Sequence, residues 1–369
     1  MDQDAARILR RLTDLVRIPS PTGQEREVQL WLASFLKELH FEVKLEEVLA
    51  GRPNLYARRG RSRFLIATHV DTVPVWGHPQ GFNAVVKDGL ACGRGVVDTK
   101  GQIAALLAAL EAAGQGVGVA LAFFVDEENE AKGSEGFGWP WQDQLEGAVV
   151  LEPTDLGIAV AQAGTLELTV TVAGTASHGA TFREADNAIL KALDLIAELR
   201  RLPFWRSSNS RFDQLGVNVG RIEGGLDVQL TPDRCTFQID LPVLPEHGLD
   251  AVRDGVLATV ERWGAQYEVH HHDPPFVTSP EAAVVRELVR AYEVTTGLPA
   301  RLVGMSAWTD AQNLVKAGLP SVILGAGELA VAHTPSECVS VEALTVLSRV
   351  LRQFLEGTVP TDLSGLRSP

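Results

Sequence analysis

The chain has 369 residues, of which 45% are hydrophobic and 22% are charged. That composition is typical of a globular protein with a sizeable core, and the length favours two domains. The net charge of −14 would repel nucleic acid and anionic membranes, so we expect neither as a partner. Charged residues throughout the opening segment MDQDAARILRRL argue against a signal peptide, and no apolar stretch approaches the ~20 residues of a membrane span.

The cysteines bear on the cellular compartment. Cys92, Cys235 and Cys338 lie far apart in the sequence and form no C-x-x-C pair. Such spacing favours reduced thiols over a disulfide framework or a Cys-rich zinc site. We therefore expect a soluble, cytoplasmic protein in which Cys338 has no functional role.

The first part of the chain alternates helical and strand-like segments. Apolar residues at helical spacing predict helices over 8–16, 24–39 and 100–113. Apolar runs of strand length, bounded by turn residues, cover 63–69, 118–126, 147–153 and, much later, 320–327. Fully apolar strands that alternate with helices predict an α/β domain with a mostly parallel sheet covered by helices.

From about residue 164 the pattern changes. Strands with one polar face and two amphipathic helices follow in the order β-α-β-β-α-β, which is that of a ferredoxin-like α+β sandwich. The segments at 280–297 and 320–327 then return to the earlier pattern. We therefore predict a first domain split into 1–163 and 278–369, with 164–277 inserted as a second domain.

Metal-competent side chains stand near the ends of all four apolar strands. They are His69 after the first strand, Asp126, Glu127 and Glu128 after the second, Glu152 after the third, His333 after the fourth, and Asp98 before the helix at 100–113. Ligands of parallel-sheet proteins gather at the carboxyl ends of strands, so these residues are expected to converge. A single Asp or His in such a place is more often a cap or a solvated loop residue. The whole group makes a metal site the better interpretation.

Two imidazoles and three carboxylates, with one carboxylate shared, make two three-ligand sites of the kind that catalytic zinc uses. Two such ions can hold one hydroxide and polarise a carbonyl group. Asp71, two residues after His69, can accept the second ring proton of that histidine. One of Glu127 and Glu128 can bind metal while the other acts as a base. Dications, rather than Lys or Arg, are then expected to hold the acidic cluster at 126–128 together.

The ordered motifs HVDTVP, GRGVVDTKG, DEE, EPT, SHG and AHTPSE resemble those of a dinuclear zinc family. This family contains acetylornithine deacetylase, succinyl-diaminopimelate desuccinylase, aminoacylase and glutamate carboxypeptidase, and the resemblance covers nearly the whole chain. It implies two Zn²⁺ per chain, with Co²⁺ or Mn²⁺ as substitutes. Asp98 becomes the bridging ligand, His69 and Glu152 complete one site, and Glu128 and His333 complete the other.

The resemblance also implies roles around the ions. Glu127 becomes the base that deprotonates the attacking water, and Asp71 becomes the partner that orients His69. A cis peptide bond is expected after the bridging ligand, between Asp98 and Thr99.

For the inserted domain, the resemblance implies a homodimer. His178, which local sequence alone would make a turn histidine, is then expected to stabilise the oxyanion in the partner's active site. Asn218 matches an asparagine that contacts substrate. Where many family members carry an arginine for the substrate carboxylate, Asp240-Leu241-Pro242 offers no cation. Arg183, Arg221 or the backbone at 325–328, beginning with Gly325, are the candidates to replace that arginine.

The implied function is metal-dependent hydrolysis of the amide bond of an N-acyl amino acid, in amino-acid biosynthesis. Hydroxide bound to the ions would attack the carbonyl. The stretches SAWTDA and GAGELAVAHT favour the acetylornithine and acetylcitrulline deacetylases, and hence arginine biosynthesis. A dipeptidase or carboxypeptidase, or a hydrolase that releases lysine or ornithine from an amino-group carrier protein, remains an alternative. A two-metal phosphoesterase would need a basic cluster that these motifs lack, and a non-catalytic binding protein would have lost a ligand or the base. The run His270–His272 is expected to lie on a solvated strand.

Overall fold

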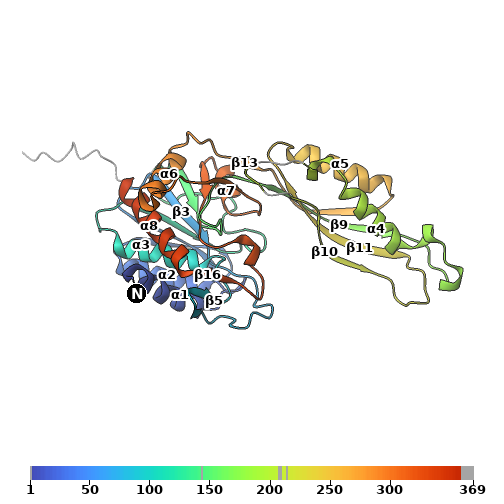
Figure 1. The fold of residues 1–369 in the computed structure, drawn as a ribbon, viewed down its shortest axis with the longest axis horizontal. Helices are drawn as coiled ribbons and strands as arrows, with labels where there is room; N and C mark the ends of the chain where they lie inside the picture. The colour runs from blue at the N-terminus through green and yellow to red at the C-terminus, as the bar shows by residue number, and fades with distance from the viewer. Residues whose placement is uncertain (1, 143, 207–209, 213–214, 359–369) are drawn as a thin grey trace, which may run out of the picture. The chain divides into compact units, whose positions relative to one another are not determined.

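The computed structural model describes residues 2–142, 144–206, 210–212 and 215–358. The chain forms two compact units (Figure 1). The first unit comprises Met1–Val160, Thr278–Leu302 and Thr309–Pro369, and the second comprises Ala161–Val277 and Val303–Trp308. The short segment Val303–Trp308 is one that the sequence pattern assigned to the first domain.

The main sheet has nine strands in the order β1-β2-β6-β3-β7-β15-β8-β13, with β14 paired to β8. Its strands are β1 Glu42–Leu49, β2 Arg52–Arg59, β3 Phe64–His69, β6 Val119–Phe124, β7 Gly147–Val150, β8 Ile158–Gln162, β13 Phe276–Val277, β14 Leu302–Met305 and β15 Ser321–Ile323. At the centre, β6, β3, β7 and β15 pair in parallel. These are the four strands that the apolar runs predict, and the mostly parallel core with its helical cover confirms the predicted α/β class. The outer pairs are antiparallel.

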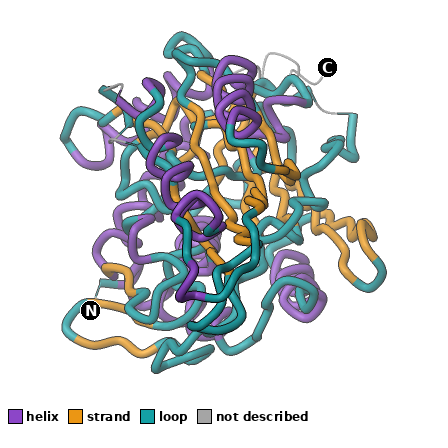
Figure 2. The backbone as a smooth tube through the Cα atoms, turned by 90° about the vertical axis from the view of Figure 1, so that its right-hand side faces the viewer, coloured by secondary structure: helices purple, strands orange, loops and turns teal. Residues whose placement is uncertain are grey.

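The helices of the first unit supply the rest of its core. They are α1 Gln3–Val16, α2 Arg26–Glu38, α3 Lys100–Ala112, α6 Ala283–Thr296, α7 Ala311–Lys316 and α8 Val341–Gly357 (Figure 2). Helix α3 is buried along almost its whole length and packs against α1 and α8. Its many alanines suit a helix that is apolar on every side. Because α3 is enclosed in this way, the loop that precedes it, which carries Asp98, starts from a fixed support.

The hairpin formed by β1 and β2 was not expected from the sequence. Strand β1 is mostly exposed and carries charges along its length, so no apolar run marks it. It lies at the edge of the sheet and pairs with β2 in an antiparallel register. Edge strands are often charged, because charge opposes pairing with another chain.

A second small sheet corrects the prediction for the cysteines. It consists of β4 Val85–Lys87, β5 Leu90–Cys92 and β16 Cys338–Ser340, in the order β16-β5-β4. Cys92 and Cys338 are direct partners in the antiparallel pair, with Cα atoms 4.1 Å apart, and they form a disulfide. Cys338 is therefore not without a role, and only Cys235 is a free, buried thiol among the described residues. The argument from reduced thiols no longer supports a cytoplasmic location, which stays a prediction.

The second unit has the predicted ferredoxin-like order of elements. These are β9 Gly164–Ala173, α4 Ala188–Leu199, β10 Asn218–Gly224, β11 Arg234–Val243, α5 Leu249–Arg262 and β12 Gln266–Asp273. The sheet order is β10-β11-β9-β12, and every pair is antiparallel. Alternate residues of β9 and β11 pack against α4 and α5, which gives this unit its own core.

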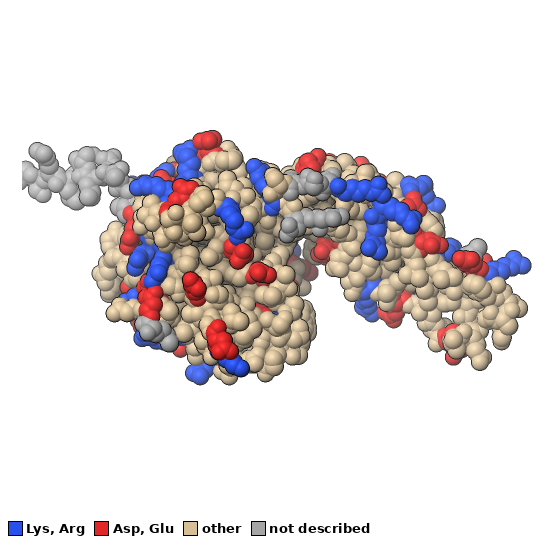
Figure 3. Space-filling view, in the orientation of Figure 1, with Lys and Arg blue, Asp and Glu red and all other residues tan. Residues whose placement is uncertain are grey.

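At the surface, charged side chains add little to stability. On the face of the first unit drawn in Figure 3, basic and acidic side chains are interspersed. A representative pair is Arg63 with Glu146, whose atoms lie 2.7 Å apart at the partly exposed surface. Exposed pairs of this kind contribute about 0–1 kcal/mol, so burial of apolar side chains stabilises the fold. Among the described helices, none has the length and apolar character needed to cross a bilayer.

Candidate metal centre

The candidate ligands come from one edge of the parallel sheet. His69 is the last residue of β3, Glu127 and Glu128 follow β6, and Glu152 follows β7. Because β3, β6 and β7 are parallel neighbours, their carboxyl ends bring these side chains together. His333 follows the short 3-10 helix Leu329–Val331.

The acidic turn after β6 has a cation of its own. Asp126 adopts a left-handed conformation, with φ 69°, and its carboxylate is buried. Arg52 Nη2, from β2, lies 2.7 Å from Asp126 Oδ1 and also contacts the buried Glu25. The prediction that no Lys or Arg holds this cluster is therefore wrong for Asp126. It was wrong because the arginine comes from a strand that no apolar run marks.

Asp98 lies between the two imidazoles. Its Oδ1 atom is 3.0 Å from His69 Nε2, and its Oδ2 atom is 3.2 Å from His333 Nε2. On one side, Glu152 Oε1 lies 3.4 Å from His69 Nε2. On the other side, Glu128 Oε2 lies 3.0 Å from His333 Nε2. The structure thus contains two groups of three possible ligands that share Asp98, and the ligand atoms of each group lie within 4.8 Å of one another.

These separations fit metal ions. Ligand atoms bound at 2.0–2.2 Å in a tetrahedron stand roughly 3.3 Å apart. In addition, Glu152 Oε1 is buried and accepts no hydrogen bond from any residue that the structure describes. A buried oxygen without a hydrogen bond is costly unless a cation compensates it. The donor set of imidazole and carboxylate is one that zinc and related divalent ions use.

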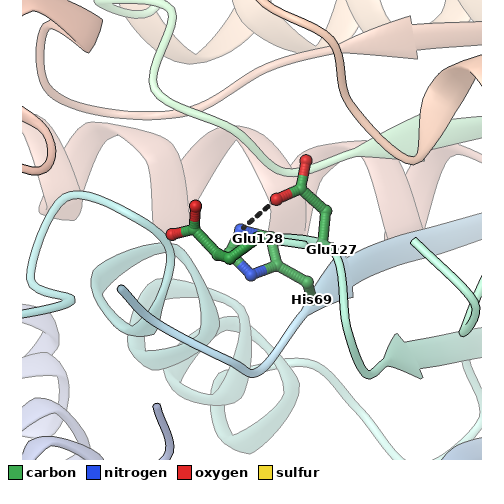
Figure 4. A group of neighbouring side chains, drawn as sticks. All are labelled: His69, Glu127 and Glu128. Atoms are coloured by element: carbon green, nitrogen blue, oxygen red, sulfur yellow. Dashed lines mark ion pairs between the residues drawn. The ribbon is translucent and has the colours of Figure 1, made fainter. Parts of the chain in front are cut away.

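Glu127 belongs to neither of the two groups that share Asp98. Its Oε2 atom lies 3.9 Å from His69 Nε2, and it forms a third possible group with His69 and Glu128. Figure 4 shows the carboxylates of Glu127 and Glu128 diverging, with Glu127 joined to the His69 ring by the marked ion pair. Of the two glutamates, Glu128 is the one that contacts His333.

Asp71 contacts both sides of the centre. Its backbone oxygen lies 3.0 Å from His69 Nδ1, and its Oδ1 lies 3.5 Å from the same atom. The carboxylate also accepts hydrogen bonds from the backbone N–H of Glu127 at 3.2 Å and of Glu128 at 3.1 Å. Asp71 therefore fixes the acidic turn as well as the ring. The peptide bond between Asp98 and Thr99 is cis.

Burial and mutual interaction change the pKa values in this centre. Burial lowers the pKa of His69, but the carboxylates of Glu152 and Glu127 outweigh it, and the pKa is raised well above its usual value. Burial raises the pKa of Glu127 and that of Glu152 well above their usual range. Burial also lowers the pKa of His333, whereas its carboxylate partners raise it to about 10. Protons and a bound cation therefore compete for these groups.

The residues expected to contact substrate lie mainly in the second unit. His178 precedes the 3-10 turn Gly179–Thr181, and its Nδ1 accepts a hydrogen bond from Ala180 N. Asn218 opens β10, and Arg221, further along that strand, is exposed and paired with Glu223. Arg183 is also exposed. None of these residues belongs to a possible metal group among the described residues, and neither does any residue of the exposed run 270–272.

Gly325 lies in the first unit, just after β15. Its N–H already donates to Thr154 Oγ1 at 3.0 Å. A side chain at this position would meet Glu152 O at 2.3 Å, so the glycine allows the backbone to pass close to the Glu152 loop. Its backbone N–H is therefore engaged, and Gly325 positions a ligand loop.

The comparison with known families decides the assignment. The model of the family described as Peptidase family M20/M25/M40 matches residues 65–357. The chain belongs to this family. Its members are metal-dependent hydrolases of amide bonds, and this protein is a metal-dependent amidohydrolase.

Individual relatives extend over nearly the whole chain. A succinyl-diaminopimelate desuccinylase of Marinobacter nauticus is 28% identical and aligns with 93% of this chain and 96% of its own. A probable carboxypeptidase of Aspergillus niger is 26% identical, with 96% and 91% covered. Among solved structures, a tripeptidase from Staphylococcus aureus has a TM-score of 0.79 at 23% identity, with 96% and 98% covered. A likeness of that kind shows the M20 fold.

Asp310 is a residue of this M20 protein that sequence reasoning overlooked. It occupies the N-cap position of α7 without making a side-chain capping hydrogen bond. It is fully buried, and neither carboxylate oxygen has a hydrogen-bond partner among the described residues. The Ser134 hydroxyl stands nearby, but its hydrogen bond is to Ala131 O. Burial raises the pKa of Asp310 to about 7, even though the neighbouring His69 lowers it. The residue stands in the SAWTDA stretch, where no neighbouring motif marks it as part of the centre.

The pH dependence of stability should reveal this carboxyl group. A pKa raised on folding means that the group stabilises the folded state fully only below its unfolded pKa near 4, and that this contribution is lost as pH rises towards 7. We expect Asp310→Asn to raise the free energy of unfolding of metal-free protein by at least about 1 kcal/mol at pH 8, with a smaller gain at pH 5. Urea unfolding at pH 5, 6.5 and 8 measures the trend. Asp194→Asn, on the exposed side of α4, is the control and should show no such trend. An Asp310→Asn effect that is equal at all three pH values would contradict the assignment.

Proposed function

We propose that this M20 enzyme is a dinuclear zinc hydrolase that removes the acyl group of an N-acyl amino acid, as acetylornithine deacetylase does. The observation that supports this best is the position of Asp98, with one carboxylate oxygen towards each imidazole. An arrangement in which one carboxylate faces two three-ligand groups is suited to a pair of ions and not to a single one. The desuccinylase name carried by relatives supports an acylated amine as the substrate.

Each residue of the centre has a distinct role in the proposed hydrolysis. Bound ions would activate a water molecule and polarise the substrate carbonyl. Glu127 takes the proton of the attacking water and passes it to the departing amine, which is general base and then general acid catalysis. Asp71 keeps the His69 ring and the turn that carries Glu127 in a fixed relation, because it contacts both. His69, Asp98 and Glu152 would hold one ion, and Asp98, Glu128 and His333 would hold the other.

The inserted unit supplies the remaining groups in this proposal. Two chains form a dimer through it, and His178 of one chain donates a hydrogen bond to the oxyanion formed in the other. Asn218 contacts the same substrate. The substrate carboxylate has no arginine at Asp240-Leu241-Pro242, and Arg183 is the exposed cation best suited to replace it, because Arg221 is paired with Glu223.

A hydrolysis screen tests the substrate class directly. The metal-loaded enzyme is assayed on N-acetylornithine, N-acetylcitrulline, N-acetyllysine, N-succinyl-diaminopimelate and several dipeptides. We expect the highest kcat/KM on an N-acetyl amino acid with a basic or carbamoylated side chain. A clear preference for dipeptides would replace the deacetylase proposal with a peptidase, which the carboxypeptidase relatives favour.

Glu127→Gln tests the assignment of the base. Because the amide cannot accept the proton, kcat should fall roughly 10²- to 10⁴-fold, whereas metal content should stay at the wild-type value. Turnover is measured with the best substrate of the screen, and metal by elemental analysis. The matched control is Glu130→Gln, an exposed neighbour that pairs with Lys132 and should keep full activity. Retained turnover in Glu127→Gln would remove Glu127 from the mechanism.

His178→Ala tests the dimer. Loss of one oxyanion donor should lower kcat roughly 10²- to 10³-fold without changing metal content. When inactive His178→Ala and inactive Glu127→Gln chains are mixed and allowed to exchange, heterodimers regain one complete site. The mixture should then recover roughly a quarter of wild-type activity. If the mixture remains as inactive as its components, His178 does not serve the partner subunit.

A further inference from the structure

A buried ion pair lies beneath the candidate metal centre. Arg94 and Glu337 are both fully buried, and Arg94 Nη1 contacts Glu337 Oε2. Neither residue is among the possible metal ligands of the described chain. They are adjacent to ligand-bearing segments, however, because Arg94 precedes Asp98 by four positions and Glu337 follows His333 by four.

The Arg94 guanidinium contacts the backbone of two such segments. Its Nε donates to Pro74 O at 3.0 Å and its Nη2 to Val75 O at 3.0 Å, in the loop that follows His69 and Asp71. Nη2 also donates to the backbone oxygen of His333 at 3.3 Å. A single planar group with donors in fixed directions thus sets the distance between the His69 loop and the His333 loop.

Glu337 contacts the third segment. Its Oε1 accepts hydrogen bonds from Val97 N at 3.0 Å and from Asp98 N at 3.3 Å. The backbone of the shared candidate ligand is therefore bound to a carboxylate that is itself bound to Arg94. The backbones of Asp98 and His333, whose side chains contact each other, are therefore both hydrogen-bonded to this ion pair.

The backbone of His333 shows why such a support is needed. Its φ is 63°, a left-handed conformation that a residue with a side chain adopts only when its surroundings enforce it. The Arg94 contact is to the carbonyl of this same residue. This hydrogen bond links the His333 backbone, through Arg94 and Glu337, to the backbone of Asp98.

A buried ion pair is weak evidence for stability, because desolvation of both charges offsets their attraction. Its value lies in fixed geometry when its hydrogen bonds are satisfied, as they are here. We infer that Arg94 and Glu337 are positioning residues that fix Asp98 and His333, and thereby set the affinity for the ion that His333 would bind. This inference rests on the proposed metal-dependent function.

Two double variants test it. Arg94→Met/Glu337→Leu removes both charges and every hydrogen bond of the pair. Arg94→Met/Glu337→Gln also removes both charges but keeps an oxygen for Val97 N and Asp98 N. Both avoid leaving one buried charge alone, which would unfold many proteins. The control is Arg11→Met/Glu111→Gln, a part-buried ion pair between α1 and α3. Arg11 also contacts Asp14 and Phe35, and none of these residues belongs to the centre.

Metal affinity is measured by calorimetric titration of Zn²⁺ into metal-free full-length protein and by the visible spectrum of the Co²⁺ form. We expect Arg94→Met/Glu337→Leu to lower the affinity for one of the two ions about 10- to 100-fold and to change the spectrum of the Co²⁺ form. The effect of Arg94→Met/Glu337→Gln should be smaller. The control should lower stability in urea without changing either readout. If Arg94→Met/Glu337→Leu does not fold, the glutamine variant decides alone.

The outcomes separate the two proposals. Wild-type affinity and spectrum in the variants would overturn the positioning role, and so would a loss of affinity matched by the control at equal loss of stability. A wild-type protein that binds no Zn²⁺ or Co²⁺ would overturn the proposed function itself, and this inference with it.

Discussion

Crowding of carboxyl groups at one edge of the parallel sheet is the constraint on which the rest of the structure depends. Asp71, Asp98, Glu127, Glu128 and Glu152 gather there around two imidazoles. Two like charges 4 Å apart repel by about 4 kcal/mol at the effective dielectric of a protein surface, and burial makes each charge costlier still. The edge can therefore exist only with compensating protons or cations. The pKa values of Glu127 and Glu152 are raised, which favours compensation by protons when no cation is bound. The spacing of the candidate ligand atoms suits compensation by metal ions.

Polar groups behind this edge hold each ligand-bearing loop in place. Arg52 neutralises Asp126 at the base of the acidic turn, and Asp71 accepts the N–H groups at its tip. Arg94 and Glu337 connect the loops on the other side. Asp71, Arg94 and Glu337 satisfy backbone groups that a loop would otherwise leave without partners in a buried setting, whereas Arg52 compensates a buried carboxylate. The parallel strands bring the candidate ligands near one another, and these polar side chains fix the final positions of the loops that carry them.

The predictable part of the protein is the part encoded locally or in ordered motifs. The apolar runs identified β3, β6, β7 and β15, because strands buried on both faces need continuous apolar sequence. Parallel pairing alone predicts that the carboxyl ends of these strands converge. The ordered motifs predict that His69, Asp98 and His333 are metal ligands.

The unpredicted features are contacts between segments distant in sequence. Cys92 and Cys338 are 246 positions apart and meet because two three-residue strands pair. Arg52 reaches Asp126 from a strand whose neighbour β1 is exposed and charged. Asp310 owes its character to complete burial, which a solvated-looking SAWTDA stretch does not reveal. In each case the role of the residue depends on which distant residues surround it in the fold, and the local sequence does not reveal them.

The two imidazoles of the centre are unequally accessible. The side chain of His69 is fully enclosed, whereas that of His333 is 44% exposed. Trp76, itself 58% exposed, stands beside the His333 ring, with the two ring planes at 78° to each other. In the proposed dinuclear centre, the ion beside His333 would therefore be the more open of the two to a chelator or an incoming reactant.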